Sequence, residues 1–212
     1  MDVRRTILVS FLTVLFPTCA FAQAKPVLVC FGDSITAGYG LAPGQSYPDA
    51  LRRDLDKLGY RYQVVNLGTS GATTKDAVER LPTVLRLHPA VVIVEFGGND
   101  GLRGLPLSAT EQNLDKVLAA LLHVHIRVLL GGITLPPNYG PDYIHAFDQV
   151  FRKAAARTRV AFVPMIYKDL IHLPGTIQPD GIHPTAKGSE ILARTLLPAL
   201  EPLLRKPRVT SR

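Results

Sequence analysis

A serine, an aspartate and a histidine stand in two short stretches that could together perform nucleophilic chemistry. Ser34 follows the apolar run 27–31 by three residues, within Gly-Asp-Ser-Ile-Thr. Asp180 and His183 lie three residues apart in Asp-Gly-Ile-His-Pro, where a glycine and a proline keep the chain out of regular helix. One turn could bring the carboxylate to Nδ1 of the imidazole and leave Nε2 to take a proton from a serine hydroxyl.

Position alone leaves the role of Ser34 open between nucleophile and helix N-cap, because both place a serine at a strand-to-helix turn. A phosphate-binding loop is excluded, since no Gly-Lys-Ser/Thr follows and Gly32, Gly38 and Gly40 lack the dinucleotide spacing. The Gly-x-Ser-x-Gly nucleophile elbow is also absent, because position 36 is threonine. The interpretation of Ser34 therefore depends on what other loops supply.

Acyl transfer also needs hydrogen-bond donors aimed at a developing oxyanion, and two glycine-rich loops offer them. Asn99, in Gly-Gly-Asn-Asp-Gly after the apolar run 91–96, could direct its side-chain amide into a cleft. A plain Asn-Asp turn is the alternative for this loop. After the run 62–66, the backbone amides of Gly68 and Gly71 both qualify on chemistry, and the residues alone do not choose between them.

The other histidines are interpreted as surface or packed residues; they are His88, His123, His125, His145 and His172. His123 and His125 have a spacing that can bind metal, but no cysteine or nearby carboxylate accompanies them. We therefore favour the end of a helix at this position.

The elements that must position these groups follow from periodicity. Short β-branched runs without polar alternation occur at 27–31, 62–66, 91–96, 128–132 and 160–163. Segments with helical spacing occur at 46–58, 75–87, 109–123, 142–158 and 185–197. Runs of this kind are typical of strands covered on both faces, and Pro198 and Pro202 are expected to end or kink the last helix. The order predicts an α/β fold, a three-layer α/β/α sandwich on five buried parallel strands whose carboxyl ends hold the ligand.

Length and composition fit one globular domain, because 212 residues with 47% hydrophobic and 19% charged side chains can bury a sizeable core. The formal net charge is +7, but outside the basic tail 205–212 the cations are scattered among acidic residues. This distribution argues against a nucleic-acid partner and leaves at most a peripheral attraction to an anionic membrane surface.

The first 22 residues have the layout of a secretory signal peptide: Arg4 and Arg5, an apolar run 7–16, and Ala-Phe-Ala ending at Ala22. An uncleaved membrane anchor is the alternative. The apolar run is shorter than the ~20 residues of a spanning helix, and a proline at position 17 interrupts it. Lipidation of Cys19 is disfavoured by its context. We expect cleavage after Ala22 and a periplasmic or secreted domain, residues 23–204, with Cys30 as a lone core residue.

Taken together, four blocks in this order resemble those of the SGNH hydrolases, also called the GDSL family. They are Gly32-Asp33-Ser34, the glycine loop after Asn66, Gly97-Gly98-Asn99-Asp100, and Asp180-x-x-His183. Three further segments, 64–66, 95–104 and 135–140, resemble the bacterial thioesterase I, arylesterase and lysophospholipase branch of this family. The resemblance as a whole spans about residues 27–200.

This resemblance implies a flavodoxin-like SGNH hydrolase fold, no metal and no cofactor. It implies that Ser34 is the nucleophile, His183 the general base and then acid, and Asp180 its orienting partner. The oxyanion hole would be formed by the Ser34 amide, the Gly71 amide and the Asn99 side chain. The branch places its oxyanion glycine five residues after the asparagine that ends the strand, which selects Gly71.

The resemblance also implies a mobile substrate-pocket loop, made of Leu135, Pro136, Pro137, Asn138 and Tyr139. The chain departs from the family pattern at Ile35 and Thr36, where the naming motif has leucine after the serine, and at Ala72, where a polar residue is common. These positions bear on loop rigidity and acyl-chain preference.

The expected activity is that of a monomeric serine hydrolase acting on small acyl esters, thioesters or lysolipids through an acyl-enzyme on Ser34. Two alternatives remain. A carbohydrate O-acetylesterase would use the same groups with a different pocket, and a non-catalytic acyl-chain or lipid carrier would use the same scaffold without turnover.

Overall fold

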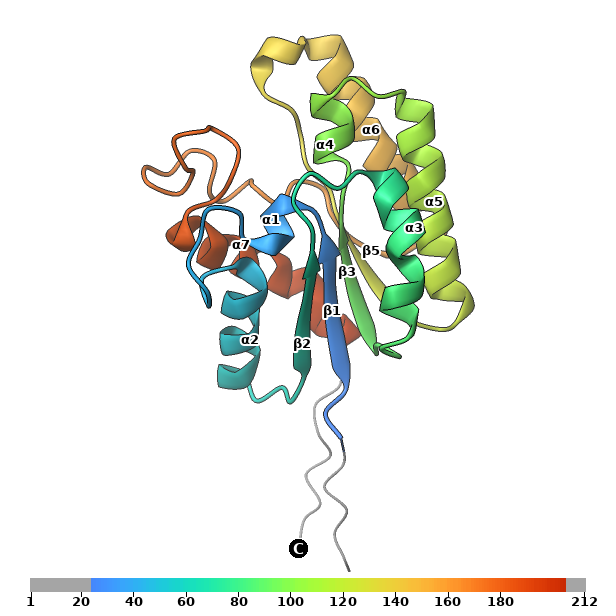
Figure 1. The fold of residues 1–212 in the computed structure, drawn as a ribbon, viewed down its shortest axis with the longest axis vertical. Coiled ribbons are helices and arrows are strands. Elements are labelled where there is room, and N and C mark those ends of the chain that lie inside the picture. The colour runs from blue at the N-terminus through green and yellow to red at the C-terminus, as the bar shows by residue number, and fades with distance from the viewer. Residues whose placement is uncertain (1–23, 205–212) are drawn as a thin grey trace, which may run out of the picture.

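The computed structural model describes residues 24–204, which form a parallel sheet with helices on both faces (Figure 1). The strands are β1 (Val27–Gly32), β2 (Gln63–Gly68), β3 (Val91–Glu95), β4 (Arg127–Gly131) and β5 (Ala161–Val163). They pair in the order β2-β1-β3-β4-β5, and every pair is parallel. The predicted α/β/α sandwich on five parallel strands is confirmed.

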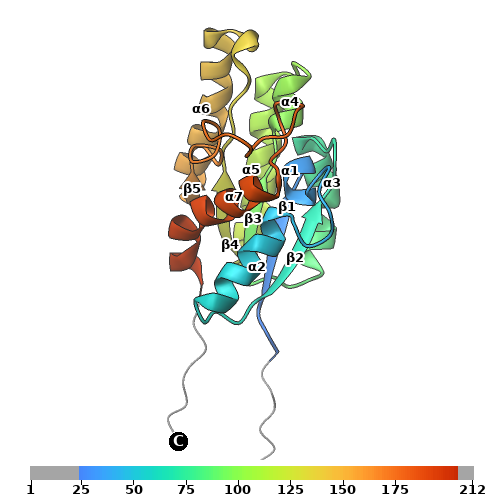
Figure 2. The same cartoon turned by 90° about the vertical axis from the view of Figure 1, so that its left-hand side faces the viewer.

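The helices follow the strands in regular alternation. They are α1 (Ser34–Ala37), α2 (Tyr47–Lys57), α3 (Thr74–Leu85), α4 (Gly98–Leu102), α5 (Leu107–His123), η1 (Pro137–Tyr139), α6 (Pro141–Thr158), α7 (Ala186–Leu200) and η2 (Glu201–Leu203). The chain passes outward from β1 to β2 and then back across β1 to β3, so right-handed crossovers place helices on opposite faces. Helices α2 and α7 pack together on one face (Figure 2), and α3, α5 and α6 cover the other.

The core is densest around the two central strands. Residues 28–31 of β1 and all of β3 are fully buried, and the rings of Phe31 and Phe96 meet edge to face at 4.8 Å between centroids. The expectation of five buried strands is wrong for β2 and β5, which expose part of their length. Each lies at an edge of the sheet with a neighbour on one side only, so Gln63 and Asn66 can face water.

Helix α7 continues past Pro198, so of the two expected outcomes, an end or a kink, this proline does not produce the end. Pro198 is exposed, and the carbonyl of exposed Arg194, which has lost its amide partner, can meet water instead. Pro202 falls in η2, directly after α7 ends. The expected helix end near His123 is confirmed, because His123 is the last residue of α5.

Several sequence-based predictions concern residues that the structure leaves undescribed. The expected signal peptide (1–22), Cys19 within it and the basic tail (205–212) all lie outside residues 24–204. In that described range no helix is both long and apolar enough to cross a bilayer. Cys30 is buried in β1 as expected, and burial raises the pKa of its thiol far above the usual range, so the thiol stays protonated.

The end of β2 lies so close to α1 that only glycine fits there. A Cβ on Gly68 would lie 2.1 Å from the Ala37 amide nitrogen and 2.6 Å from its Cα, both backbone atoms that cannot swing aside. We therefore expect Gly68→Ala to lower the free energy of unfolding by about 1–3 kcal/mol, the usual range for an overpacked site.

Urea denaturation measures this effect. Gly98→Ala is a suitable control, because a Cβ there would meet Asp33 Oδ2 at 3.5 Å, an ordinary contact, at a backbone conformation that alanine adopts. An unchanged unfolding midpoint for Gly68→Ala would contradict the close approach of β2 and α1.

Candidate active site

The loops after β1 and β5 bring Ser34, His183 and Asp180 into one hydrogen-bonded series. Ser34 Oγ lies 2.9 Å from His183 Nε2, and His183 Nδ1 lies 2.7 Å from Asp180 Oδ2. Since a carboxylate only accepts hydrogen bonds, Nδ1 carries the ring proton. The lone pair of Nε2 therefore faces the Ser34 hydroxyl, as a general base requires.

Asp180 holds both the histidine ring and the turn that carries it. Its Oδ1 accepts hydrogen bonds from the backbone amides of Ile182 and His183, at 2.9 and 3.0 Å, while Oδ2 faces the ring. Partial burial acts to raise the pKa of Asp180, but these amide bonds and the imidazole outweigh it and lower the pKa below its usual value. The carboxylate is thus charged at neutral pH.

Asp33, and not Ser34, is the N-cap of α1, so the N-cap interpretation of Ser34 is wrong. Asp33 Oδ1 accepts a hydrogen bond from the Ile35 amide at 3.0 Å, and Ser34 is the first residue inside the helix. Because the neighbouring aspartate performs the capping, the serine hydroxyl remains available to His183. The sequence carried this signal, since aspartate is as good a cap as serine.

The two predicted oxyanion loops both reach the same cavity, which Ser34, Gly71 and Asn99 line together. Gly68, the other glycine candidate, donates its amide to Asn66 Oδ1 at 2.8 Å and so is already engaged. The Gly71 carbonyl accepts a hydrogen bond from Arg103 Nη2 at 3.0 Å, which ties its loop to the end of α4.

Asn99 lies in the first turn of α4, so the loop is not a plain Asn-Asp turn. The N-cap of this helix is Gly97, whose φ of 113° is a conformation that only glycine adopts readily. Asn99 Nδ2 donates to the Ala72 carbonyl at 3.0 Å and to Asp33 Oδ2 at 3.2 Å. These contacts fix the Asn99 side-chain amide at the rim of the cavity. An oxyanion bound there would be a further acceptor for the same amide protons.

The cavity beside Ser34 has a volume of about 490 Å³ and is mostly apolar. Its hydrophobic lining comes from several loops: Ile35, Leu102, Ile133, Leu135, Met165, Tyr167, Ile171 and Ile182. Ile35, a departure from the family pattern, therefore shapes the pocket directly. Such a surface fits an acyl chain or an aromatic group better than a polyol.

The predicted pocket loop contributes only in part. Leu135, Pro136 and Pro137 line the cavity, whereas Asn138 is exposed. The Tyr139 hydroxyl donates instead to the Leu102 carbonyl at 2.8 Å, and its ring stacks on Tyr143. The tyrosine anchors the loop to α4 and α6, because its phenol donates to a partly buried carbonyl of α4 and its ring stacks on α6.

Two residues that the sequence analysis missed connect the serine loop to the histidine loop. Gln178 Nε2 donates to the carbonyls of Tyr39 and Pro184, both at 2.8 Å, and its backbone amide donates to the His183 carbonyl at 2.7 Å. The Tyr39 ring lies 4.6 Å from the His183 ring. No local pattern marks either residue, because the contact forms between loops far apart in the sequence.

Metal ligation was not expected at this site. Across residues 24–204, histidine, cysteine, aspartate and glutamate nowhere gather in a group of three or more that could hold a metal ion.

Residues 30–191 match the family described as GDSL-like Lipase/Acylhydrolase. The chain is 41% identical over 182 residues to Esterase TesA of Pseudomonas aeruginosa, covering 85% of this chain and 90% of that protein. It is 36% identical over 184 residues to Thioesterase 1/protease 1/lysophospholipase L1 of Escherichia coli K12, covering 86% and 87%. The crystal structure of TesA superposes with a TM-score of 0.81 at 41% identity, over 84% of this chain and 99% of that one.

The Gln178 side chain should matter for the alignment of Ser34 with His183. Gln178→Ala removes two hydrogen bonds, each worth about 1 kcal/mol, and so loosens the contact between the two loops. We expect kcat to fall by about tenfold with a smaller change in KM, measured by steady-state ester hydrolysis.

Gln112→Ala, the same change at an exposed position on α5, serves as control and should leave kcat unaltered. Equal activity of the two variants would show that the loops are aligned without Gln178.

Proposed function

The chain belongs to the GDSL-like lipase/acylhydrolase family, the SGNH hydrolases, and from that membership and the geometry of its site we propose that it hydrolyses carboxylic esters and thioesters through a covalent acyl-enzyme on Ser34. The observation that carries this proposal is the unbroken series from Ser34 Oγ through His183 to Asp180 at the mouth of an apolar cavity. A serine hydroxyl is a weak nucleophile without such a base.

In the first half of the reaction, Ser34 Oγ bonds to the acyl carbon while its proton passes to His183 Nε2. The carbonyl oxygen becomes an oxyanion in a tetrahedral intermediate. Asp180, already ionised, stabilises the imidazolium that forms and keeps its ring in place. His183 then gives the proton to the leaving alkoxide or thiolate, and the acyl group remains on Ser34.

In the second half, His183 takes a proton from water, whose oxygen attacks the acyl carbon, and returns a proton to Ser34 Oγ as the acid leaves. We assign the amides of Ser34 and Gly71 and the side chain of Asn99 as donors to the oxyanion, since all three residues line the cavity. Each such donor typically contributes a factor of about 10²–10³ to kcat.

The apolar lining supports acyl chains and aryl groups as the substrate parts that enter the cavity. This favours simple esters, thioesters and lysolipids over the acetylated carbohydrates of the alternative hypothesis, because the lining offers few partners for sugar hydroxyls. A carrier without turnover has no use for an aligned base beside the serine. Monomeric state and a weak attraction to anionic membranes remain part of the proposal.

We also propose that the protein is exported and acts in the periplasm or outside the cell. The support is the arrangement of residues 1–22: two arginines, an apolar run and a small-residue cleavage site. Ester and lysolipid substrates are accessible there, whereas acyl-CoA thioesters are cytoplasmic.

Removing the nucleophile tests the activity. Ser34→Ala should lower kcat for short p-nitrophenyl esters by a factor on the order of 10⁴–10⁶, because no other group can accept the acyl chain. Ser108→Ala, the same change at an exposed position in α5, should keep full activity. Undiminished turnover by Ser34→Ala, with its fold verified by circular dichroism, would overturn the proposal.

Export is tested by expressing the full chain in a bacterial host, separating the cell fractions and measuring the mass of the intact protein. The predicted species begins at Gln23 and appears in the periplasm or medium. A chain lacking residues 2–22 should stay in the cytoplasm. A full-length protein retained in the membrane fraction would contradict cleavage after Ala22.

A further inference from the structure

Glu95 is a buried carboxyl group for which the proposed reaction has no use. It is the last residue of β3, two residues before the glycines of the Asn99 loop, and is only 2% exposed. Burying a charge without compensation costs several kcal/mol. A glutamate at the end of an otherwise apolar strand therefore requires a physical account.

The hydrogen bonds around Glu95 run in one direction. Thr36 Oγ1 donates to Glu95 Oε2 at 2.8 Å, and the Tyr47 hydroxyl lies 3.1 Å from the same Thr36 oxygen, placed to donate to it. Glu95 Oε1 is buried and receives no hydrogen bond from any residue in 24–204. The neighbouring Asp33 carboxyl raises the pKa of Glu95 through its charge, because two unprotonated carboxylates close together repel each other. One proton between them removes this repulsion.

Asp33 is the better site for the negative charge. Its Oδ1 accepts from the Ile35 amide and its Oδ2 from Asn99 Nδ2, so donors already face both oxygens. Glu95 accepts from the Thr36 hydroxyl and from the Asp33 backbone amide, but its Oε1 is left without a donor among residues 24–204. A carboxylate that accepts several hydrogen bonds is favoured as the anion, and its neighbour then keeps the proton.

We propose that Asp33 and Glu95 share one proton, held on Glu95, and that the resulting Asp33 carboxylate is the positioning group for the Asn99 amide and for the first turn of α1. The function of this pair in catalysis rests on the proposed function. The series then runs Tyr47 to Thr36 to Glu95 to Asp33, with every proton donated toward Asp33.

The surrounding charges agree with this assignment. Burial, and then the Asp33 charge, raise the pKa of Glu95 well above its usual value, and burial raises that of Asp33 to about 6. The other titratable groups that face the pair are His183, Asp100, Tyr47 and Tyr167. The pKa values of both tyrosines are raised by burial, so they stay neutral, and the charge of His183 acts to lower the pKa of Asp33.

The experiment compares Glu95→Gln with the wild-type protein. Glutamine imitates protonated glutamate, since its amide donates to Asp33 and its oxygen accepts from Thr36. In the unfolded wild-type chain Glu95 ionises above about pH 4.3, whereas in the folded protein it stays neutral. The free energy of unfolding of the wild type therefore falls as pH rises from about 4.3 toward the raised pKa of folded Glu95. Glu95→Gln removes this loss. The ratio of folding constants, variant over wild type, should rise by up to about tenfold per pH unit between pH 5 and 8.

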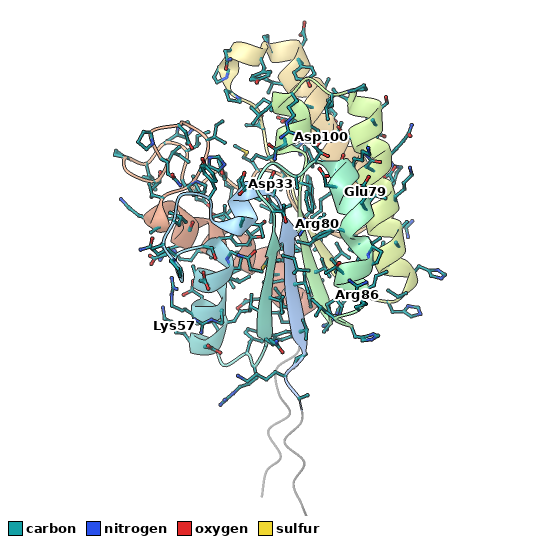
Figure 3. The ribbon with its side chains drawn as sticks, in the orientation of Figure 1. Asp33, Lys57, Glu79, Arg80, Arg86 and Asp100 are labelled. Carbon is teal, nitrogen blue, oxygen red and sulfur yellow. The ribbon has the colours of Figure 1, made fainter. Side chains whose placement is uncertain are left out.

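The control is Glu79→Gln on α3, where the glutamate is exposed beside Lys75 and far from Asp33 (Figure 3), and its ratio should not change with pH. A second measurement uses turnover: Asp33→Asn should lower kcat by a factor on the order of 10², with KM nearly constant, and Glu95→Gln should lower it far less.

A flat stability ratio for Glu95→Gln would overturn the shared proton, and this result involves no turnover. Equal losses of kcat in Glu95→Gln and Asp33→Asn would overturn the positioning role of the Asp33 charge. If Ser34→Ala retained activity while the stability ratio rose as expected, the proposed function would fail and the shared proton would stand.

Discussion

The hydrogen bond from Ser34 Oγ to His183 Nε2 joins loops that are 149 residues apart in the sequence, and the rest of the site depends on it. It forms because parallel strands place all their carboxyl ends at one edge of the sheet. The loops after β1, β2 and β3 bring Ser34, Gly71 and Asn99 to that edge, and the segment after β5 returns His183 to the same point. Gln178 fastens this last segment to the carbonyl of Tyr39, just beyond α1.

Several polar side chains are buried near this hydrogen bond, at the end of a sheet that is otherwise hydrophobic. Asp33, Thr36 and Glu95 are almost fully buried, and Asp100 nearby accepts hydrogen bonds from Thr74 and Thr110. Such groups are stable only when each finds a partner, and a half-satisfied network costs more than an apolar core. One proton placed on Glu95 completes the series and leaves the Asp33–Glu95 pair with one charge, on Asp33, next to the oxyanion donors.

Much of the fold could be predicted from sequence because strand and helix periods are local properties, and five runs and five helical segments lie within a few residues of the observed elements. The grouping of Ser34 with Asp180 and His183 could also be predicted from the sequence, because a serine nucleophile needs a histidine base and a carboxylate that orients it. The cap at Asp33, the direction of Tyr139 and the exposure of β2 were not predicted. The cap could have been found in the sequence, because aspartate caps a helix as well as serine does. The Tyr139 contact and the exposure of β2 depend on neighbours and on a position in the sheet that only the folded chain defines.

Covalent labelling tests most directly whether Ser34 carries the acyl group. A fluorophosphonate added to the intact enzyme should attach once, with the modification on Ser34 in the digested protein, and the Ser34→Ala variant should stay unlabelled. Labelling at another residue, or none in an enzyme that still hydrolyses esters, would contradict the account.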